Sequence, residues 1–125
     1  MVRRTALLFI LVLVLGSCGG ATGGTSASAG DPDAGKQLYD ANCASCHGDD
    51  LRGTDKGTSH LSVVYEPSHH GDAAFSLAVK LGVRQHHWDF GDMPPVEGLS
   101  DADLAAITAY VRSVQEREGF EPYPP

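Results

Sequence analysis

Apolar residues follow a helical spacing most clearly near the C-terminus. They recur there at i, i+3, i+7 and i+10, namely at Leu104, Ile107, Val111 and Val114, which is the spacing of one face of an α-helix. Ser100, followed three residues later by Asp103, approximates a capping box at the start of such a helix. The proline-rich residues 122–125 cannot extend it. The pattern therefore predicts a helix that begins after Ser100 and ends near Gly119.

A first helix is predicted to begin at residues 31–32. Aspartate is a favourable N-cap, and proline suits the first helical position because its missing N–H would have no partner there. Apolar residues recur at i, i+4 and i+7 (Ala34, Leu38 and Ala41), with Gly35 and Tyr39 alongside, and predict its apolar face. Gly35 costs about 1 kcal/mol relative to alanine within a helix, which favours a close crossing with another helix at that residue.

A second helix is predicted at residues 72–81. Phe75, Ala78 and Val79 are expected on its inward face, and Gly82 at its end. Residues 49–59 are polar and indicate a loop, whereas residues 61–65 are mostly apolar and fit either a brief strand or a packing patch. Together these segments predict an all-α fold with three to four helices, in which the first helix crosses another at Gly35.

The N-terminal 17 residues have the features of an export signal. Arg3 and Arg4 precede an unbroken apolar run of 10 residues at positions 6–15, which is too short to span a bilayer but suits a signal peptide. Residues 15–18 (L-G-S-C) resemble the lipobox of bacterial lipoprotein precursors, although an ordinary cleavage site with a nearby cysteine would look similar. A lone thiol after such a segment is best explained as a lipid anchor, so Cys18 is the predicted lipidation site.

Composition divides the rest of the chain. Residues 19–30 contain only glycine, alanine, serine and threonine, so residues 18–30 are predicted to form a flexible tether. Residues 31–120 form the predicted domain, and residues 121–125 form a proline-rich tail. Of the 125 residues, 42% are hydrophobic but only 7% are aromatic, which predicts a thin core that a buried apolar group would complete.

The charge of the chain excludes some partners. The formal net charge is -7, with nine basic and 16 acidic residues. Removal of Arg3 and Arg4 with the signal segment would leave seven basic residues and a net charge of -9. Such a chain is not expected to bind nucleic acid or anionic lipid directly.

Cys43, Cys46 and His47 form a C-x-x-C-H run, the attachment signature of a c-type haem. The two thiols can each bond to a vinyl group of the porphyrin, and the histidine that follows becomes an axial ligand of the iron. A zinc site would need further ligands at matching spacing, but no second cysteine pair is present. A redox-active cysteine pair would normally follow a strand of a βαβ unit. The motif therefore predicts one covalently bound haem c, with iron as its metal.

Met93 is the predicted second axial ligand. It is the only methionine that remains after signal processing, and it lies in a G-D-M-P-P loop 46 residues beyond His47. A thioether is a soft ligand that raises the reduction potential of a histidine-ligated haem. The alternatives are that Met93 fills a gap in the core, or that His86 or His87 binds the iron instead and gives a bis-histidine haem of lower potential.

Four of the remaining five histidines occur in two adjacent pairs, His69-His70 and His86-His87. Both pairs are expected in solvated loops close to the haem propionates, rather than at a second metal. Trp88 is expected either to donate its indole N–H to a propionate or simply to pack.

The order of these motifs resembles that of the class I, monohaem c-type cytochromes. The resemblance extends over about residues 31–115 and lies in G-K-Q-L-Y at 35–39, C-A-S-C-H-G at 43–48, G-D-M-P-P at 91–95, L-S-D-A-D-L at 99–104 and I-T-A-Y-V at 107–111. It implies the small cytochrome c fold, with Gly35 and Tyr39 of one terminal helix touching Tyr110 of the other. Members often carry a proline about a dozen residues after the histidine, whose carbonyl orients the imidazole. Residues 57–60 contain no proline, so another backbone carbonyl is expected to orient His47.

Iron bound by His47 and Met93 has no open coordination position, which predicts one-electron transfer rather than catalysis. The leading hypothesis is an electron carrier tethered outside the cytoplasm, on a bacterial membrane, between respiratory or dehydrogenase complexes. Its partners would be redox proteins, with no small-molecule substrate. The alternative is a cytochrome subunit or haem sensor of one membrane complex. A peroxidase-type enzyme is disfavoured because a filled sixth position leaves no distal pocket.

Overall fold

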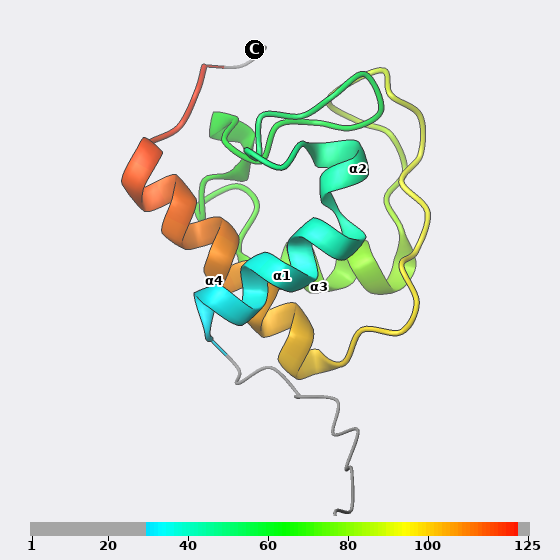
Figure 1. Cartoon of the computed structure of the whole chain (residues 1–125). Helices are drawn as coiled ribbons and strands as arrows, with labels where there is room; N and C mark the ends of the chain where they lie inside the picture. Colours follow the sequence, from blue (N-terminus) through cyan, green and yellow to red (C-terminus); the bar gives the residue numbers. More distant parts are fainter. Residues whose placement is uncertain (1–29, 123–125) are drawn as a thin grey trace, which may run out of the picture.

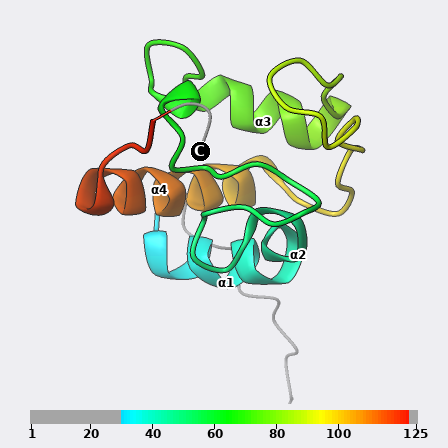
Figure 2. The ribbon, with the colours of Figure 1, turned by 90° about the horizontal axis from the view of Figure 1, so that it is seen from above.

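Four α-helices form the framework of the chain in a computed structural model that describes residues 30–122 (Figures 1 and 2). The helices are α1 (Pro32–Asn42), α2 (Ala44–His47), α3 (Asp72–Leu81) and α4 (Asp101–Glu118), with a short 3₁₀ helix η1 (Val63–Tyr65) between α2 and α3. In residues 30–122 the only β pairing is three isolated bridges. The predicted all-α fold is therefore confirmed.

Helices α1 and α4 cross at Gly35 (Figure 1). A Cβ atom on Gly35 would lie 2.0 Å from the carbonyl oxygen of Ala106, so only glycine fits at this crossing. One turn later, the rings of Tyr39 and Tyr110 meet edge to face with 5.5 Å between their centroids. The crossing predicted from Gly35, Tyr39 and Tyr110 is confirmed.

The start of α1 and most of its inward face agree with the prediction. The Asp31 carboxylate accepts hydrogen bonds from the backbone N–H groups of residues 33 and 34, at 3.0 and 3.4 Å. Gly35 and Tyr39 are the buried residues of the helix, and Leu38 packs against the core, whereas Ala41 is exposed. The prediction was wrong at Ala41, because the contact with α4 is made by a glycine and a large aromatic ring.

Helix α4 lies between the α1–α2 segment and α3, as Figure 2 shows from above. Its predicted apolar residues are all buried: Leu104, Ile107, Val111 and Val114. The predicted capping box is present, since Ser100 Oγ accepts from the Asp103 N–H at 3.2 Å and Asp103 Oδ2 accepts from the Ser100 N–H at 2.9 Å. The helix predicted at residues 72–81 is also confirmed as α3.

The polar loop after α2 contributes more to the core than its composition predicted. Leu51, within the predicted loop, is 1% exposed and has a positive φ of 66°. Leu61 is fully buried, and the next apolar residues form η1 rather than a strand. The loop therefore packs under the helices instead of lying free in solvent.

Arg112 of α4 joins three segments through its guanidinium group. It donates to the carbonyl oxygens of Tyr65 at 2.5 Å and His70 at 2.7 Å, and to the Asp72 carboxylate at 2.8 Å. Its guanidinium carbon also lies 5.1 Å from the centroid of the Phe75 ring. One half-buried arginine thus fixes the segment between η1 and α3 against α4.

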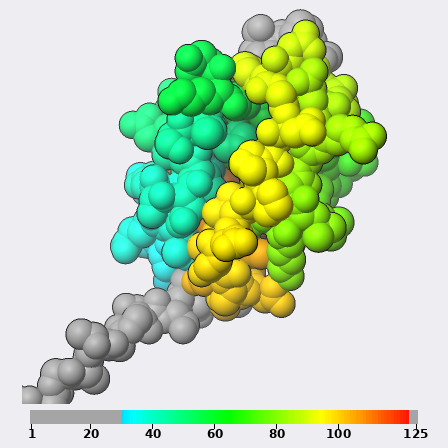
Figure 3. All heavy atoms as spheres, turned by 90° about the vertical axis from the view of Figure 1, so that its right-hand side faces the viewer, coloured from blue at the N-terminus to red at the C-terminus, as the bar shows by residue number. Residues whose placement is uncertain are grey.

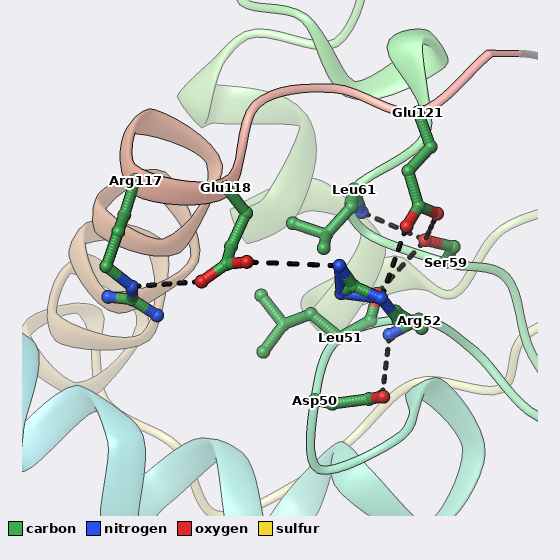
Figure 4. A network of polar contacts seen from close by, with 8 residues as sticks. All are labelled: Asp50, Leu51, Arg52, Ser59, Leu61, Arg117, Glu118 and Glu121. Atoms are coloured by element: carbon green, nitrogen blue, oxygen red, sulfur yellow. Dashed lines mark hydrogen bonds and ion pairs between the residues drawn. The ribbon is translucent and has the colours of Figure 1, made fainter.

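The chain after α4 returns to the loop near Arg52 (Figure 4). The N–H of Glu121 donates to the Leu61 carbonyl at 2.7 Å, and Arg52 lies 3.3 Å from the Glu121 carboxylate and 3.9 Å from that of Glu118. The predicted tail begins at residue 121, so its first residue is attached to the domain. Cys18, the signal segment and nearly all of the tether lie outside the described residues. Within residues 30–122, no helix has the length and apolarity needed to cross a bilayer.

Candidate functional site

A cavity of about 560 Å³ opens between the α1–α2 segment and the loop after α3. Figure 3 shows this face, where the two segments lie on opposite sides of a narrow seam. The cavity lining includes residues from every predicted part of the site: Cys43, Cys46, His47 and Met93, with Leu104, Ile107 and Val111 from α4. Residues widely separated in the sequence therefore meet around one apolar space.

The two cysteines lie at the junction of α1 and α2. Cys43 caps the C-terminus of α1, and the N–H of His47 donates to the Cys43 carbonyl at 2.9 Å, which closes a helical turn. Cys43 and Cys46 are both half-buried free thiols, not joined by a disulfide. Burial raises the pKa of Cys43 to about 11, so it is a neutral thiol at pH 7. A reactive redox cysteine would have a lowered pKa instead.

His47 is oriented by a backbone carbonyl. Its Nδ1 lies 2.9 Å from the carbonyl oxygen of Thr58, and because a carbonyl can only accept, Nδ1 carries the proton. Burial lowers the pKa of His47, which favours the neutral ring. Nε2 is then the nitrogen that can bind a metal, as in metal sites whose histidine is held through its other nitrogen. Thr58 supplies the carbonyl that the sequence predicted without identifying its residue.

The loop that carries Thr58 fits closely beneath the cysteine motif. A Cβ atom on Gly57 would lie 2.8 Å from the Cys46 carbonyl oxygen. Thr54 Oγ1 donates to that same oxygen at 2.7 Å. The absence of a side chain at residue 57 therefore lets the loop approach closely enough for the bond to His47.

His60 is a site residue that the sequence did not single out. Its ring stacks on that of His47 with 4.2 Å between centroids, and its Nδ1 lies 3.3 Å from the Tyr39 hydroxyl. Burial, and the neighbouring His47, hold the pKa of His60 well below its ordinary value, so the ring is neutral. A single histidine in a polar loop gave no periodic signal of this buried position.

Met93 lies in a loop segment with little freedom. Its N–H donates to the Val83 carbonyl, and its carbonyl accepts from the Val83 N–H, both at 2.9 Å. A Cβ atom on Gly82 would lie 2.6 Å from the Met93 carbonyl oxygen, so the end of α3 packs directly on the loop. The half-buried Met93 side chain lines the cavity. A thioether is thus available on the wall of the same cavity as His47.

The structure places His86, His87 and Trp88 on the cavity wall as well. The Trp88 ring lies nearly parallel to that of Tyr65, with 6.2 Å between centroids and 12° between planes, a geometry that fits the packing role considered for it. His86 and His87 thus line the same cavity as Met93, so each is a competing candidate for the second iron ligand.

These features fit a covalently held iron porphyrin. An imidazole nitrogen and a thioether sulfur are ligands of haem iron in electron-transfer proteins, and the thiols of Cys43 and Cys46 line the same cavity. The cavity wall carries large apolar side chains, and Leu77, Leu81 and Phe90 extend this apolar surface to its exposed rim. A zinc site would not need so large an apolar cavity.

Comparison with known proteins agrees with this fit. The family model described as cytochrome c matches residues 32–115. Cytochrome c-554(547) of Halothiobacillus neapolitanus is 32% identical over 92 residues, which cover 70% of this chain and 100% of that relative. The family model covers more than half of the chain and includes both the C-x-x-C-H run and Met93. This protein therefore belongs to the cytochrome c family.

Proposed function

We propose that this protein is a monohaem electron carrier, anchored by a lipid on the extracytoplasmic side of a bacterial membrane, with histidine and methionine as its axial ligands. The observation that carries the proposal is that His47, oriented through Nδ1 by Thr58, and the thioether of Met93 line one apolar cavity. This is the ligand pair of many electron-transfer haems.

The family supplies the general function. Proteins of the cytochrome c family hold haem c covalently, pass electrons to redox partners and are not enzymes, so the predictions of haem c and of an electron-transfer protein are confirmed. Members of the family typically work outside the cytoplasm. The individual ligands, the membrane anchor and the respiratory setting belong to the proposal.

Four side chains would hold the haem. Cys43 and Cys46 would bond to it through thioethers, and Nε2 of His47 and Sγ of Met93 would bind its iron. The bound haem supplies one-electron redox chemistry. The protein keeps His47 fixed through Thr58 and the Met93 backbone fixed through Val83. Rigid ligands keep the coordination unchanged between the two oxidation states, which favours rapid electron transfer.

The structure gives Met93 an advantage over His86. The Nδ1 atom of His86 lies 2.8 Å from the Arg84 carbonyl, in an exposed part of the loop. Met93 is half-buried, and its backbone is paired on both sides with Val83. His87 contacts other histidines, with Nε2 3.3 Å from that of His69. We therefore assign the second axial position to Met93.

The ligand assignment is tested by the Met93→Ala variant of the purified holoprotein. Ferric protein should show the weak long-wavelength absorption of methionine sulfur bound to haem iron. Met93→Ala should abolish that band and lower the reduction potential, whereas His86→Ala and His87→Ala, the matched controls, should retain both. A spectrum and potential that Met93→Ala leaves unchanged, but that one histidine variant alters, would assign the position to that histidine.

Covalent attachment and membrane anchoring have separate tests. Haem should remain on the chain after acidified organic extraction and denaturing electrophoresis, and Cys43→Ala with Cys46→Ala should release it. Cys18→Ala should move the protein from the membrane fraction to the soluble fraction. Tight membrane association without that thiol would rule out the lipid anchor.

The proposed electron-carrier function can be tested by the salt dependence of electron transfer. A net charge of -9 in the processed chain should steer the protein toward partners with basic residues, and salt should slow this association because the Debye length is only about 10 Å at 0.1 M. Stopped-flow oxidation by a membrane oxidase should therefore slow with salt. Stoichiometric binding of carbon monoxide to the ferrous form at neutral pH would reveal an open sixth position and favour a sensor instead.

A further inference from the structure

Two histidine pairs that are distant in the sequence meet beside the haem cavity. His69 and His70 directly precede α3, and His86 and His87 follow it. The ring centroids of His70 and His87 lie 5.4 Å apart, and those of His69 and His87 lie 5.3 Å apart. From the sequence, each pair was expected in a solvated loop. The spacing of the histidines does not show that the loops before and after α3 meet.

Three of these side chains have the spacing of a metal site. One ring nitrogen from each of His69, His70 and His87 lies within 4.8 Å of the others. The Nε2 atoms of His69 and His87 are 3.3 Å apart. Two nitrogens bound to zinc at about 2.0–2.1 Å in tetrahedral geometry lie roughly 3.3 Å apart, so this pair is already at the required separation.

His70 is held in the orientation that a ligand needs. Its Nδ1 lies 2.7 Å from the Val64 carbonyl, which fixes the proton on Nδ1 and leaves Nε2 as the nitrogen for a metal. Metal-binding histidines commonly donate their other N–H to a carbonyl in this way. The carbonyl of His70 also accepts from Arg112 Nη2 at 2.7 Å, so the backbone beneath the ring is anchored to α4.

We propose that His69, His70 and His87 form a binding site for one zinc-type divalent transition-metal ion, with water as the fourth ligand. Imidazole nitrogen is suited to zinc, copper and nickel, whereas calcium and magnesium prefer oxygen ligands. Three histidines with a water ligand are a known zinc arrangement. The three ligands are all imidazoles, with no carboxylate or thiolate among them. The expected ion is therefore one that prefers nitrogen ligands.

The site is distinct from the haem-iron ligands proposed above. His70 and His87 line the haem cavity, whereas His69 is exposed and lies outside its lining. Haem iron with His47 in place can accept only one further ligand, so it cannot take all three.

A bound ion would join two parts of the cavity wall. His69 and His70 belong to the segment that Arg112 fixes against α4, whereas His87 belongs to the loop that continues to Met93. An ion shared between them would bind the folded state and not the unfolded chain, and would therefore stabilise the holoprotein.

The test is a calorimetric titration of ZnCl₂ into chelator-treated holoprotein in the ferric state. Zinc is not redox-active, so the haem spectrum reports independently on the iron ligands. We expect one equivalent to bind, and His69→Ala to weaken binding at least thirtyfold without changing the haem spectrum. Zinc at 100 times its Kd should raise the Tm of the parent protein by roughly 10 °C, and this shift should be lost in His69→Ala.

His86→Ala is the matched control, because His86 lies in the same loop but outside the three-nitrogen set. It should bind one equivalent of zinc with affinity within about threefold of the parent protein. No binding by the parent protein, or unchanged binding by His69→Ala, would overturn the proposal. Loss of zinc in His86→Ala would also overturn it. These outcomes leave the haem assignment standing, since covalent haem and the Met93-dependent band are measured separately.

Discussion

The imidazole ring of His60 stacks on that of His47, with 4.2 Å between their centroids and 17° between their planes. His60 is 8% exposed and lies edge-on to the rings of Tyr39, Tyr65 and Phe75. Its carbonyl also accepts from the Gln115 side chain at 2.6 Å. His47 is thus held by a hydrogen bond through Nδ1 and by a packed ring on its face.

Replacement of His60 should therefore weaken the fold around His47. His60→Ala removes a buried ring and leaves the Tyr39 hydroxyl without its Nδ1 partner, so it should lower the free energy of unfolding by about 2–4 kcal/mol. His60→Phe retains the stacked ring and should cost only about 1 kcal/mol, from the lost hydrogen bond. Denaturant unfolding of the holoproteins would compare them, and equal losses would show that stacking contributes little.

The crossing of α1 and α4 should be very sensitive to residue 35. In Gly35→Ala the new methyl group would meet the Ala106 carbonyl at 2.0 Å, so the helices must separate. We expect a loss of about 2–3 kcal/mol despite the better helix propensity of alanine. Gln37→Ala, on the exposed face of α1, should change stability by less than about 0.5 kcal/mol. Thermal unfolding would measure both, and a neutral Gly35→Ala would contradict the close crossing.

Arg112 should matter more than any exposed ion pair. Arg112→Met leaves the carbonyls of Tyr65 and His70 without their donor and should cost about 3 kcal/mol. Arg117→Met removes a charge whose one ion-pair partner within residues 30–122 is the exposed Glu118, and should cost less than about 1 kcal/mol. Similar losses in the two variants would show that the guanidinium of Arg112 is not the anchor of the segment before α3.

The helices and the chemical motif could be predicted from the sequence because each has a local signal. The capping box at Ser100 and Asp103, the periodic residues of α4 and the C-x-x-C-H run depend only on neighbours along the chain. Gly35 also predicted the crossing correctly, since a glycine within a helix has a cost that a close contact can explain.

The missed features depend on contacts between distant segments. Leu51 is a core residue within a polar loop, and Arg112 is a charged residue with three partners that lie 40 to 47 positions away. His60 and the meeting of the two histidine pairs are similar cases. Periodicity reports which face of a helix is apolar, but it does not report which loop folds beneath that helix.

The capping box predicts a change in stability at acid pH. Hydrogen bonds from the Ser100 side chain and then from its backbone N–H lower the pKa of Asp103. Its carboxylate therefore stabilises the fold above the unfolded pKa of about 3.9, and this contribution is lost as the pH falls through the lower folded pKa. Asp103→Asn should be less stable than the parent protein at pH 6, and the difference should shrink toward pH 3. A constant difference across this range, measured by denaturant unfolding, would exclude the carboxylate as its source.

The fit of Gly57 beneath the cysteine motif predicts a shift in reduction potential. In Gly57→Ala the new methyl group would meet the Cys46 carbonyl at 2.8 Å, so the loop must move away and lengthen the bond between His47 Nδ1 and the Thr58 carbonyl. A weaker bond makes the imidazole a poorer donor to iron and favours the ferrous state. We expect the potential to rise by tens of millivolts, where about 59 mV corresponds to a tenfold change in a one-electron equilibrium.

Thr58→Ser is the matched control for this measurement. It changes the residue that carries the acceptor but keeps both its carbonyl and its hydroxyl group, so its potential should stay within about 10 mV of the parent value, well under the tenfold step of about 59 mV. Spectroelectrochemical titration would measure all three proteins, and the Met93-dependent band would check that the second axial ligand remains bound. A lower potential in Gly57→Ala with that band intact would contradict the argument, because it would mean that the His47 imidazole had become a stronger donor when its carbonyl partner was moved away.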